Sequence, residues 1–409
     1  MKCGLLGRKL GHSYSPMIHA QLGTYSYDLF EKEPEEVDSF LTSGDFDAIN
    51  VTIPYKKTAI MFCDELSDIA KRVGAVNTLV RRADGKLVGH NTDYFGFQSM
   101  LHHSGLQPCG KKILIFGSGG VSAPVAAVLE EQGAKVFVIS HKENKPEILL
   151  QHADASIIVN ATPVGMYPSV GFSPVDLGLF PQLEGVLDLI FNPAKTKLLI
   201  DAEERGLVTE NGLWMLVAQA KESSEWFTGT TISNVIIEPI YQKLCNQMQN
   251  IVLIGMPGSG KTTIGRILAE KLKKQFVDAD MYLVECSGRN IADIFTADGE
   301  SGFRTLETEC LSKLGKQSGL VIATGGGCVT RLDNYPLLHQ NGRIIWIKRA
   351  LNRLAVDGRP LSQSTTAADM YRVREPMYRR FADLAVNNDS TPDETAQKIL
   401  NLLESGESK

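Results

Sequence analysis

The chain has 409 residues, of which 43% are hydrophobic and 22% are charged, and it contains 37 glycines and 17 prolines. This composition is typical of a globular α/β protein with two or three domains, and it excludes an intrinsically disordered, collagen-like or disulfide-stapled chain. The formal net charge is -5, with 42 basic and 47 acidic residues, which argues against a general nucleic-acid-binding protein.

The cysteines and the apolar runs indicate a cytoplasmic enzyme. The 7 cysteines include no C-x-x-C pair, so we expect reduced and mostly buried thiols rather than a zinc site or a disulfide framework. The first residues turn polar too early for a signal peptide, and no apolar run approaches the roughly 18 residues that span a bilayer. We therefore expect small-molecule partners, without nucleic acid or membrane, and a homodimer as one possible assembly.

Residues 1–100 have their own α/β pattern, with strand ends at KCGLLG, DAINVTIP and LVGHNTD. Polar side chains follow each of these ends. Among them, Lys56 and Asp93 lie at the ends of different strands and could act as a coupled proton donor and acceptor for carbonyl reduction. An ordinary exposed ion pair is the alternative for these two residues.

The first of two glycine-rich turns lies in residues 111–133, KKILIFGSGGVSAPVAAVLEEQG. A buried strand, a tight turn and an amphipathic helix in this order open a βα unit. The turn departs from the dinucleotide-binding pattern G-x-G-x-x-G only at Ser122, and it predicts a cradle for a pyrophosphate. The next strand, 135–139, ends in Ser140, His141 and Lys142. Because these three residues include no acid, NADP is favoured over NAD, and a merely solvated histidine is the alternative for His141.

A domain boundary is predicted near residue 246. A periodic run at residues 232–244 indicates the last helix of the first half, and the polar stretch LCNQMQN follows it without proline or glycine. We expect a short structured connection rather than a flexible tether. The predicted domains are therefore residues 1–246 and 250–409.

The second glycine-rich turn, in NIVLIGMPGSGKTTIGRILAEKL at residues 250–272, predicts a phosphate site. Residues 255–262 match G-x-x-x-x-G-K-[ST] at every fixed position. Its backbone N–H groups form an anion nest at a helix N-terminus, Lys261 adds a positive charge for the β- and γ-phosphates, and Thr262 offers a hydroxyl for Mg²⁺. The motif binds ATP or GTP; a glycine turn that only connects strand and helix is the alternative.

Acidic and basic residues after this motif indicate an anionic hydroxy acid as the phosphate acceptor. Asp278 and Asp280 place two carboxylates near the phosphate loop, where they can hold Mg²⁺ through water and accept a proton from a hydroxyl. Arginine is the natural bidentate partner of a carboxylate. Candidate anion-binding groups lie at Arg304, in the triple-glycine turn 325–327, and at Arg359 and Arg374. Surface salt bridges are the alternative for these arginines.

The order and spacing of these motifs over residues 250–405 resemble shikimate kinase. The match rests on FVDADMYLVECSGRNIADIFTADGESGFRTLE, the triple-glycine turn and R-x-P-x-Y. The resemblance implies that Asp280 lies beside the acceptor hydroxyl and that Asp278 joins Thr262 at Mg²⁺. It implies a carboxylate site formed by Arg304, Gly326 and Arg374. It implies an ATP site formed by Gly258, Ser259, Gly260, Lys261, Thr262, Thr263 and a lid residue, Arg359, with Arg353 against adenine. The lid region RLAVDGRPL is short, and VNNDSTPDE lacks a late arginine that some members place near the adenine.

Residues 1–246 resemble shikimate dehydrogenase. Three stretches complete the match: NATPVGM at 160–166, DLIFNP at 188–193 and GLWMLVAQA at 212–220. The resemblance implies that Lys56 is the main acid/base group. It implies a substrate site formed by Ser13, Ser15, Thr52, Asn77, Asp93 and Gln219. It implies an NADP(H) site formed by Asp68, Gly117, Ser118, Gly119, Gly120, Val121, Ser140, His141, Lys142, Leu189 and Gly212. Phe191 stands where this family usually has tyrosine, which removes a hydroxyl donor.

Together the two resemblances imply one α/β chain that catalyses consecutive steps of aromatic amino-acid biosynthesis. A substrate subdomain (residues 1–100 plus about 220–246) and a Rossmann-type NADP subdomain (101–219) would reduce 3-dehydroshikimate to shikimate. A P-loop kinase domain with a parallel sheet (250–409) would then phosphorylate shikimate with ATP and Mg²⁺. The alternatives are a quinate dehydrogenase using NAD, a kinase for another hydroxy acid such as gluconate, or one domain that only senses metabolites.

Overall fold

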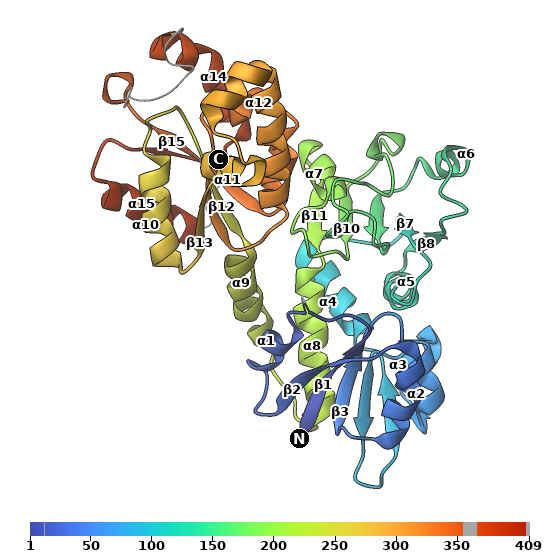
Figure 1. Ribbon diagram of the computed structural model, residues 1–409. Helices are drawn as coiled ribbons and strands as arrows, with labels where there is room; N and C mark the ends of the chain where they lie inside the picture. The colour runs from blue at the N-terminus through green and yellow to red at the C-terminus, as the bar shows by residue number, and fades with distance from the viewer. Residues whose placement is uncertain (12, 355–365, 406–409) are drawn as a thin grey trace. The chain divides into compact units, whose positions relative to one another are not determined.

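The computed structural model describes residues 1–11, 13–354 and 366–405, and the chain forms two compact units (Figure 1). The first unit contains Met1–Met166, Phe172–Phe191 and Leu198–Leu244, and the second contains Tyr167–Gly171, Asn192–Lys197 and Cys245–Lys409. Within the described ranges, every helix is too short or too polar to cross a membrane.

The first unit begins with a six-stranded mixed sheet, drawn in blue in Figure 1. The strand order is β2-β1-β3-β5-β6-β4, with parallel pairing of β1 to β2 and β3 and antiparallel pairing of β5 to β3 and β6. The strands are β1 Lys2–Gly7, β2 Ser26–Glu31, β3 Ala48–Val51, β4 Glu65–Leu66, β5 Thr78–Arg81 and β6 Leu87–His90. The helices are α1 Ser15–His19, α2 Pro34–Ser43, the 3-10 helix η1 Thr58–Phe62 and α3 Asp68–Val73.

Helix α2 shows how local sequence sets these elements against the sheet. Its first turn is closed by a capping box between Glu33 and Glu36, and it ends at Gly44, whose φ of 64° suits a residue without a Cβ atom. Val37 and Leu41 lie one turn apart and are both buried in the hydrophobic cluster that covers this sheet. The helix is therefore fixed by its caps and by one apolar stripe.

The second sheet of the first unit is entirely parallel. Its order, β11-β10-β9-β7-β8, places β7 between β8 and β9, so the chain leaves β7 at the point where the strand order reverses. The strands are β7 Lys112–Phe116, β8 Lys135–Ile139, β9 Ile157–Asn160, β10 Gly185–Asp188 and β11 Val208–Asn211. The helices are α5 Ser122–Glu131, α6 Pro146–Leu149, η2 Leu150–His152, η3 Leu177–Leu179 and α7 Lys197–Glu204.

Two long helices, α4 (Asp93–Ser104) and α8 (Leu213–Thr228), connect the two sheets of this unit. They approach closely at Gly96, where an added Cβ atom would lie 2.8 Å from both the Cβ atom of Gln219 and the carbonyl oxygen of Met215. This close packing brings Asp93, in the first turn of α4, near Gln219 in the middle of α8. Because α8 runs through residue 220, a single helix serves both subdomains.

The periodic run at residues 232–244 forms η4 (Asn234–Ile236) and α9 (Ile237–Met248), so the helix ends four residues later than the periodicity predicts. The next strand begins at Asn250, leaving one residue between the two elements. Lys274 Nζ donates to the carbonyl groups of Asn246, Gln247 and Gln249 at 2.6, 3.0 and 2.8 Å. The last carbonyl groups of a helix have no intrahelical hydrogen-bond donors, and the Lys274 ammonium group is the donor for these.

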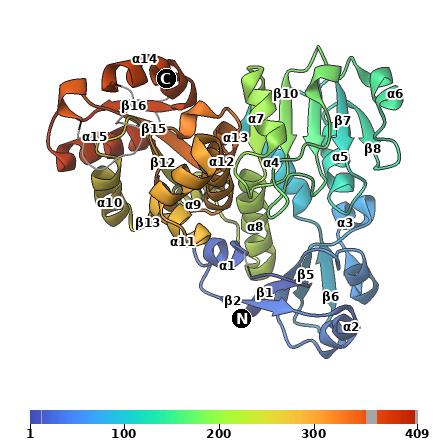
Figure 2. The same ribbon diagram turned by 45° about the horizontal axis from the view of Figure 1, so that its top comes forward.

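The second unit is a parallel sheet of order β13-β14-β12-β15-β16, with helices on both faces (Figure 2). The strands are β12 Asn250–Ile254, β13 Gln275–Asp278, β14 Leu320–Ala323, β15 Gly342–Lys348 and β16 Leu384–Asn387. The helices are α10 Lys261–Leu272, α11 Ala279–Ser287, α12 Ile291–Gly315, η5 Cys328–Thr330, α13 Asn334–His339, η6 Leu351–Arg353, α14 Ala367–Phe381 and α15 Pro392–Glu404. Helix α12 is interrupted at Gly299, where φ is 68°.

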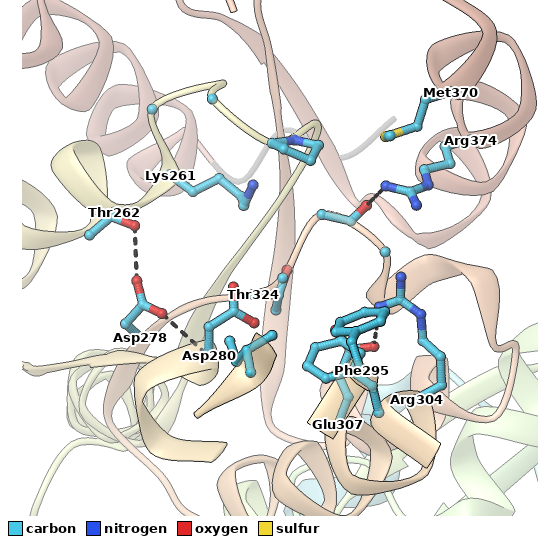
Figure 3. Close-up of a pocket in the computed structure, with 18 of the residues that line it drawn as sticks. Lys261, Thr262, Asp278, Asp280, Phe295, Arg304, Glu307, Thr324, Met370 and Arg374 are labelled. Carbon is cyan, nitrogen blue, oxygen red and sulfur yellow. Dashed lines mark hydrogen bonds and ion pairs between the residues drawn. The ribbon is translucent and has the colours of Figure 1, made fainter. Parts of the chain in front are cut away.

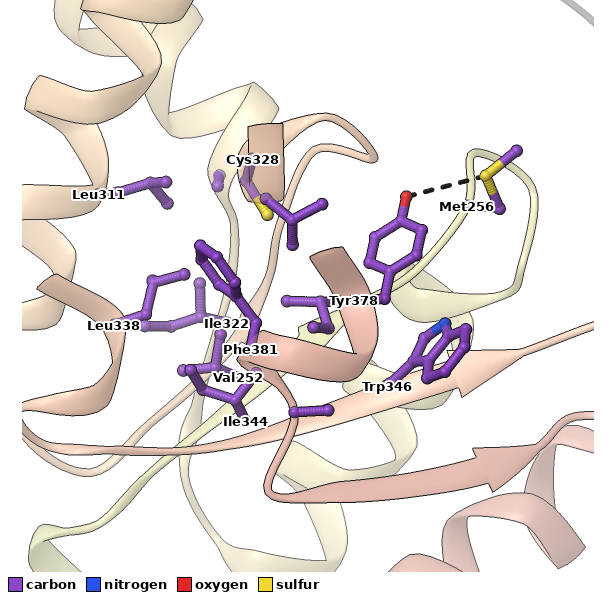
Figure 4. Close-up of a cluster of buried hydrophobic side chains, with 14 of the residues drawn as sticks. Val252, Met256, Leu311, Ile322, Cys328, Leu338, Ile344, Trp346, Tyr378 and Phe381 are labelled. Atoms are coloured by element: carbon purple, nitrogen blue, oxygen red, sulfur yellow. Dashed lines mark hydrogen bonds between the residues drawn. The ribbon is translucent and has the colours of Figure 1, made fainter. Parts of the chain in front are cut away.

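Alternate residues of β12 build two separate cores, one on each face of this sheet. Val252 joins Trp346, Tyr378 and Phe381 on one face, as Figure 4 shows. Leu253 joins the apolar side chains of α10 and α15 on the other face. Side chains of a strand alternate between faces, so a run buried on both faces is continuously apolar.

The structure has all seven cysteines as free thiols. The expectation that most are buried is wrong, because Cys3, Cys310 and Cys328 are buried while Cys109 and Cys286 are exposed and the other two are half-buried.

Candidate active sites

The loop between β12 and α10 has the backbone of a phosphate cradle. Gly255, Gly258 and Gly260 have φ values of 145°, 81° and 98°, which side-chain-bearing residues rarely adopt. A Cβ atom at Gly255 would lie 2.4 Å from the carbonyl oxygen of Ile347, and one at Gly260 would lie 2.5 Å from Asn388 Nδ2. Because the loop ends at the N-terminus of α10, its free N–H groups and the helix dipole suit an anionic phosphate.

Side chains on both sides of the loop hold it in shape. Lys261 is buried and donates from Nζ to the carbonyl groups of Gly255 at 2.8 Å and Met256 at 3.0 Å. Asn388 donates to the carbonyl oxygen of Ser259 at 2.8 Å. Asn388 lies 129 residues away in sequence, so motif spacing gave no signal for it.

Two oxygen-bearing side chains meet beside the cradle, and they suit a hard cation (Figure 3). Thr262 Oγ1 donates to Asp278 Oδ2 at 2.9 Å, and the other oxygen of Asp278 accepts from the amide N–H groups of Asp280 at 3.1 Å and Met281 at 3.4 Å. Among the described residues, no group of three His, Cys, Asp or Glu side chains is arranged to hold a metal. A cation here would therefore complete its shell with water and phosphate oxygens, as Mg²⁺ does.

A cavity of about 670 Å³ extends from the cradle to the predicted acceptor site. It is lined by Gly258, Gly260, Lys261, Thr262, Thr263, Asp278, Asp280, Arg304, Glu307, Gly326 and Arg374, among others. The structure thus brings together most of the kinase residues predicted from the sequence. Arg359 lies outside the described residues. Arg353 donates to the carbonyl oxygen of Asp389 at 3.2 Å, on η6.

Arg304 is anchored by two carboxylates of its own helix. Its guanidinium donates to Glu307 at 2.7 Å and to Glu300 at 3.1 Å. Arg304 is 6% exposed and Glu307 is 3% exposed. Burial raises the pKa of Glu307 and the Arg304 charge lowers it, with burial dominating. Sequence reasoning missed Glu307; its only signal was the i, i+3 spacing to Arg304 on one helix face.

The triple-glycine turn allows backbone and side chains to crowd beside Arg304. A Cβ atom at Gly327 would lie 2.0 Å from Arg304 Nη2, and one at Gly326 would lie 2.5 Å from Pro257. The Gly326 carbonyl accepts from Arg374 at 3.2 Å and from the hydroxyl of Tyr378 at 2.5 Å. Gly326 therefore fixes the direction of the second predicted carboxylate-binding arginine.

In the first unit, Lys56 and Asp93 form an ion pair of 2.5 Å between Lys56 Nζ and Asp93 Oδ2. Their side chains are 16% and 8% exposed, so the alternative of an ordinary exposed ion pair is wrong. A Cβ atom at Gly120 would lie 4.0 Å from Lys56 Cδ, which places the lysine beside the first glycine-rich turn. An amine, a carboxylate and a glycine turn thus meet in one place.

The predicted substrate residues come from several elements, and two of them, Asn77 and Gln219, contact Thr92, the residue before Asp93. Ser13 and Ser15 lie in the turn that leads into α1, where the Ser15 amide donates to Ser13 Oγ at 3.2 Å, and Thr52 follows β3. Asn77 Oδ1 accepts from the Thr92 amide at 2.7 Å, and Gln219 Oε1 accepts from Thr92 Oγ1 at 3.2 Å. Thr92 was not predicted, although it directly precedes Asp93.

Phe191 packs edge-on against Tyr14, with ring centroids 6.0 Å apart and planes at 75°. Tyr14 stands between the two predicted serines. Burial raises the pKa of Tyr14, so its phenol stays protonated at neutral pH. The apolar ring at position 191 is therefore packed against a tyrosine of the same turn.

The first glycine-rich turn forms a groove of about 310 Å³ with the end of α3, lined by Val73, Gly74, Ser118, Gly119, Gly120 and Ser122, among others. A Cβ atom at Gly117 (φ 110°) would lie 2.9 Å from the carbonyl oxygen of Ala161. Ser122, in the third glycine position, is buried and donates to the Gly117 carbonyl at 2.7 Å. The small, backbone-rich lining suits a dinucleotide pyrophosphate.

Other predicted cofactor residues are distributed unevenly. Leu189 and Gly212 meet, because a Cβ atom at Gly212 would lie 2.1 Å from the Leu189 carbonyl oxygen. Val121 is the N-cap of α5. Asp68 lies in the first turn of α3, and its side chain is fully exposed, with Oδ1 3.6 Å from Lys71 Nζ. The groove is lined by Val73, at the other end of this helix.

The turn after β8 contains a carboxylate, Glu143, that was not among the predicted cofactor residues. Glu143 Oε2 accepts from the Ser140 amide at 3.0 Å. Hydrogen bonds from Ser140 lower the pKa of Glu143, so this carboxylate is charged beside His141 and Lys142. Glu143 directly follows the three residues predicted to favour NADP, and the turn after β8 places its carboxylate against the Ser140 amide.

Comparisons with known proteins follow the same division of the chain. A family model described as shikimate kinase matches residues 257–404, and one described as shikimate dehydrogenase substrate binding domain matches residues 5–79. Shikimate dehydrogenase (NADP(+)) of Clostridium perfringens (strain SM101 / Type A) is 34% identical over 266 residues, which cover 59% of this chain and 97% of that protein.

Two solved structures resemble the same part of the chain. Shikimate dehydrogenase 1 from Peptoclostridium difficile has a TM-score of 0.55 and 37% identity, covering 60% of this chain and 98% of that one. Shikimate 5-dehydrogenase from Thermus thermophilus, in complex with NADP(H) and shikimate, has a TM-score of 0.54 and 30% identity, covering 59% of this chain and 99% of that one.

Proposed function

We propose that this chain is a bifunctional enzyme. Over its first three fifths it belongs to the shikimate dehydrogenase family, and it carries a shikimate kinase domain in residues 257–404. Residues 1–246 reduce 3-dehydroshikimate to shikimate, and residues 250–409 phosphorylate shikimate to shikimate 3-phosphate. The observation that carries this proposal is that each of two glycine cradles lies beside an acid/base group: Lys56 with Asp93 in one unit, and Asp280 in the other.

In the reduction, Lys56 donates a proton to the alkoxide that develops on the ring carbonyl. NADPH, when bound, supplies the hydride. Asp93 holds the ammonium group in place through their 2.5 Å ion pair. Asn77 and Gln219 orient the ring hydroxyl groups, and orientation of this kind accounts for a large share of an enzyme's rate.

In the phosphorylation, Asp280 accepts a hydrogen bond from the ring 3-hydroxyl and orients it for attack on the γ-phosphoryl group of ATP. Lys261 and the N–H groups of the cradle stabilise the charge on the phosphates. Arg304 and Arg374 hold the substrate carboxylate. Mg²⁺, when bound by Thr262 and Asp278 through water, neutralises phosphate charge. Mg²⁺, a cytoplasmic location and a homodimer stay predictions.

The deciding experiment supplies the full chain with 3-dehydroshikimate, NADPH, ATP and MgCl₂ and follows NADPH oxidation and ADP release together. We expect both, with ADP release abolished when NADPH is omitted and restored by added shikimate. NADPH oxidation without ADP release would refute the kinase half. ADP release that ignores shikimate would refute the acceptor, and quinate with NAD⁺ or gluconate with ATP tests the two competing substrates directly.

A further inference from the structure

Four buried polar side chains contact Asn77 or Gln219, two of the predicted substrate residues of the first unit. Asn50 is in β3, Thr78 begins β5, Thr92 precedes α4, and Ser223 lies in α8. None of the four is more than 5% exposed. Polar groups buried to this degree are costly unless they are hydrogen-bonded, so their partners determine how they are oriented.

Asn50 is the centre of this cluster. Its Nδ2 donates to Ser223 Oγ at 2.7 Å, to Thr78 Oγ1 at 3.1 Å and to the carbonyl oxygen of Asn77 at 3.2 Å. Its Oδ1 accepts from the hydroxyl of Tyr27 at 2.8 Å, and Tyr27 in turn contacts the side chain of Ser15. Both ends of the Asn50 amide are therefore occupied, and its orientation is determined.

Ser223 links Asn50 to residues of α8 and to Thr92, which precedes α4. It donates to the carbonyl oxygen of Gln219, one turn earlier, at 2.9 Å, and its oxygen lies 3.0 Å from Thr92 Oγ1. Thr92 Oγ1 is also 3.2 Å from Gln219 Oε1 and 3.2 Å from Asn77 Oδ1. A single threonine hydroxyl thus lies between the two side-chain amides predicted to hold the substrate.

These contacts decide which end of each amide remains for a ligand. Asn77 Oδ1 accepts from the Thr92 amide at 2.7 Å and from Thr78 Oγ1 at 3.0 Å, which uses both of its lone pairs. The donor end of Asn77 is then the end available to a substrate hydroxyl. Gln219 is held from both ends, because its Nε2 also donates to the Leu216 carbonyl at 3.0 Å.

We propose that Asn50 and Ser223 are positioning residues, which hold the side chains of Asn77 and Gln219 in the orientation that receives the ring hydroxyl groups of the substrate. This inference rests on the proposed dehydrogenase function. Neither residue contacts the substrate. Both act through the hydroxyl groups of Thr78 and Thr92. These hydroxyl groups point toward the side-chain amides of Asn77 and Gln219 as long as Asn50 and Ser223 occupy the remaining hydrogen-bonding positions of the two threonines.

The chain offers a matched pair of variants for the test. Ser223 and Ser224 are neighbours in α8 and both are fully buried, but the Ser224 hydroxyl accepts from Tyr25 at 2.8 Å instead of contacting Asn50 or Thr92. Ser223→Ala and Ser224→Ala therefore remove the same group at the same depth from the same helix. Shikimate oxidation with NADP⁺ by the full chain gives KM for each substrate.

We expect Ser223→Ala to raise KM for shikimate about tenfold while KM for NADP⁺ stays within about twofold of wild type. Ser224→Ala should leave both KM values near wild type, and Ser223→Thr, which keeps a hydroxyl, should restore most of the shikimate affinity. Equal effects of the two alanine variants, or a parallel rise in both KM values for Ser223→Ala, would overturn the inference and indicate a packing role.

If Ser223→Ala does not fold, Thr78→Val tests the same idea by removing the hydroxyl that donates to Asn77 Oδ1 while keeping the shape of the side chain. A selective rise in KM for shikimate supports the proposal, and unchanged KM values overturn it. An inactive wild-type chain would instead refute the dehydrogenase function, so the two failures are distinguishable.

Discussion

The guanidinium of Arg304 and the carboxylate of Glu307 lie 2.7 Å apart, one turn from each other on α12, and both are almost completely buried. A buried carboxylate destabilises the fold unless it is paired with a positive charge. We therefore infer that Glu307 has a function at the predicted acceptor site beside it. Glu307 holds the guanidinium of Arg304 in the lining of the cavity in which the substrate carboxylate is proposed to bind.

We predict that Glu307→Gln raises KM for shikimate in the kinase reaction roughly tenfold, because Arg304 loses the charge that orients it. The free energy of unfolding of the second unit should fall by about 1–3 kcal/mol, since a buried hydrogen-bonded charge is replaced. Glu300→Gln is the matched control: Glu300 contacts the same guanidinium at 3.1 Å but is 51% exposed, so its loss should change KM less than about twofold. Similar effects of the two variants would contradict the positioning role of Glu307.

Lys56→Ala should lower turnover in the reduction by at least about 100-fold, because it removes the amine that is paired with Asp93 at 2.5 Å. Kinase turnover, measured on the same sample by ADP release, should stay within about twofold of wild type, since the substitution changes no residue of the second unit. A parallel loss of both activities would show that the two sites are not independent.

Asp280→Asn should abolish phosphoryl transfer, by roughly 100-fold or more, while the affinity for ATP is retained. Asp280 lies at the triple-glycine turn, where a Cβ atom at Gly325 would be 2.9 Å from its Oδ1. Calorimetric titration with ATP separates the two effects. Weaker ATP binding together with unchanged turnover at saturation would assign this carboxylate to the nucleotide instead of the acceptor.

Glu143→Gln should lower KM for NADPH about two- to fivefold and leave KM for NADH nearly unchanged. The charged Glu143, held by the Ser140 amide, repels a 2′-phosphate at the end of β8, and NADH has no such phosphate. Glu147→Gln, an exposed change in the first turn of α6, serves as the control for the loss of one surface charge. Equal changes for NADPH and NADH would place the 2′-phosphate elsewhere.

The stability of the first unit should fall in mild acid because of His90. Burial lowers the pKa of His90 to about 4, whereas an unfolded histidine titrates near about 6.5. The unfolded state therefore binds more protons between these values, so the stabilisation is complete above pH 6.5 and is lost as the pH falls toward 4. At pH 5 the loss is about 2 kcal/mol relative to pH 7.5.

Urea unfolding of wild type and His90→Gln at pH 7.5 and pH 5.0 measures this contribution. The variant should lose about 2 kcal/mol less than wild type between the two pH values. His102→Gln, an exposed change near the end of α4, should behave as wild type. Identical pH dependence in all three proteins would contradict the assignment to His90.

The sequence by itself determined both glycine cradles and the elements around them. Gly255, Gly258 and Gly260 adopt φ values that suit glycine, and the strand before and the helix after each turn follow from local periodicity. Candidate acids and bases such as Lys56, Asp93 and Asp280 were also recognisable, because residue type and distance from a motif are local properties of the chain.

Only the tertiary structure decided what those groups contact. Asn50 and Ser223 are 173 residues apart and Lys56 and Asp93 are 37 apart, so their hydrogen bonds depend on the sheet order and on the close packing of α4 against α8. The extension of α9 depends in the same way on Lys274, which follows the next helix. Local sequence sets backbone conformation through steric exclusion, whereas the partner of a buried polar group is set by whichever distant segment the fold places beside it.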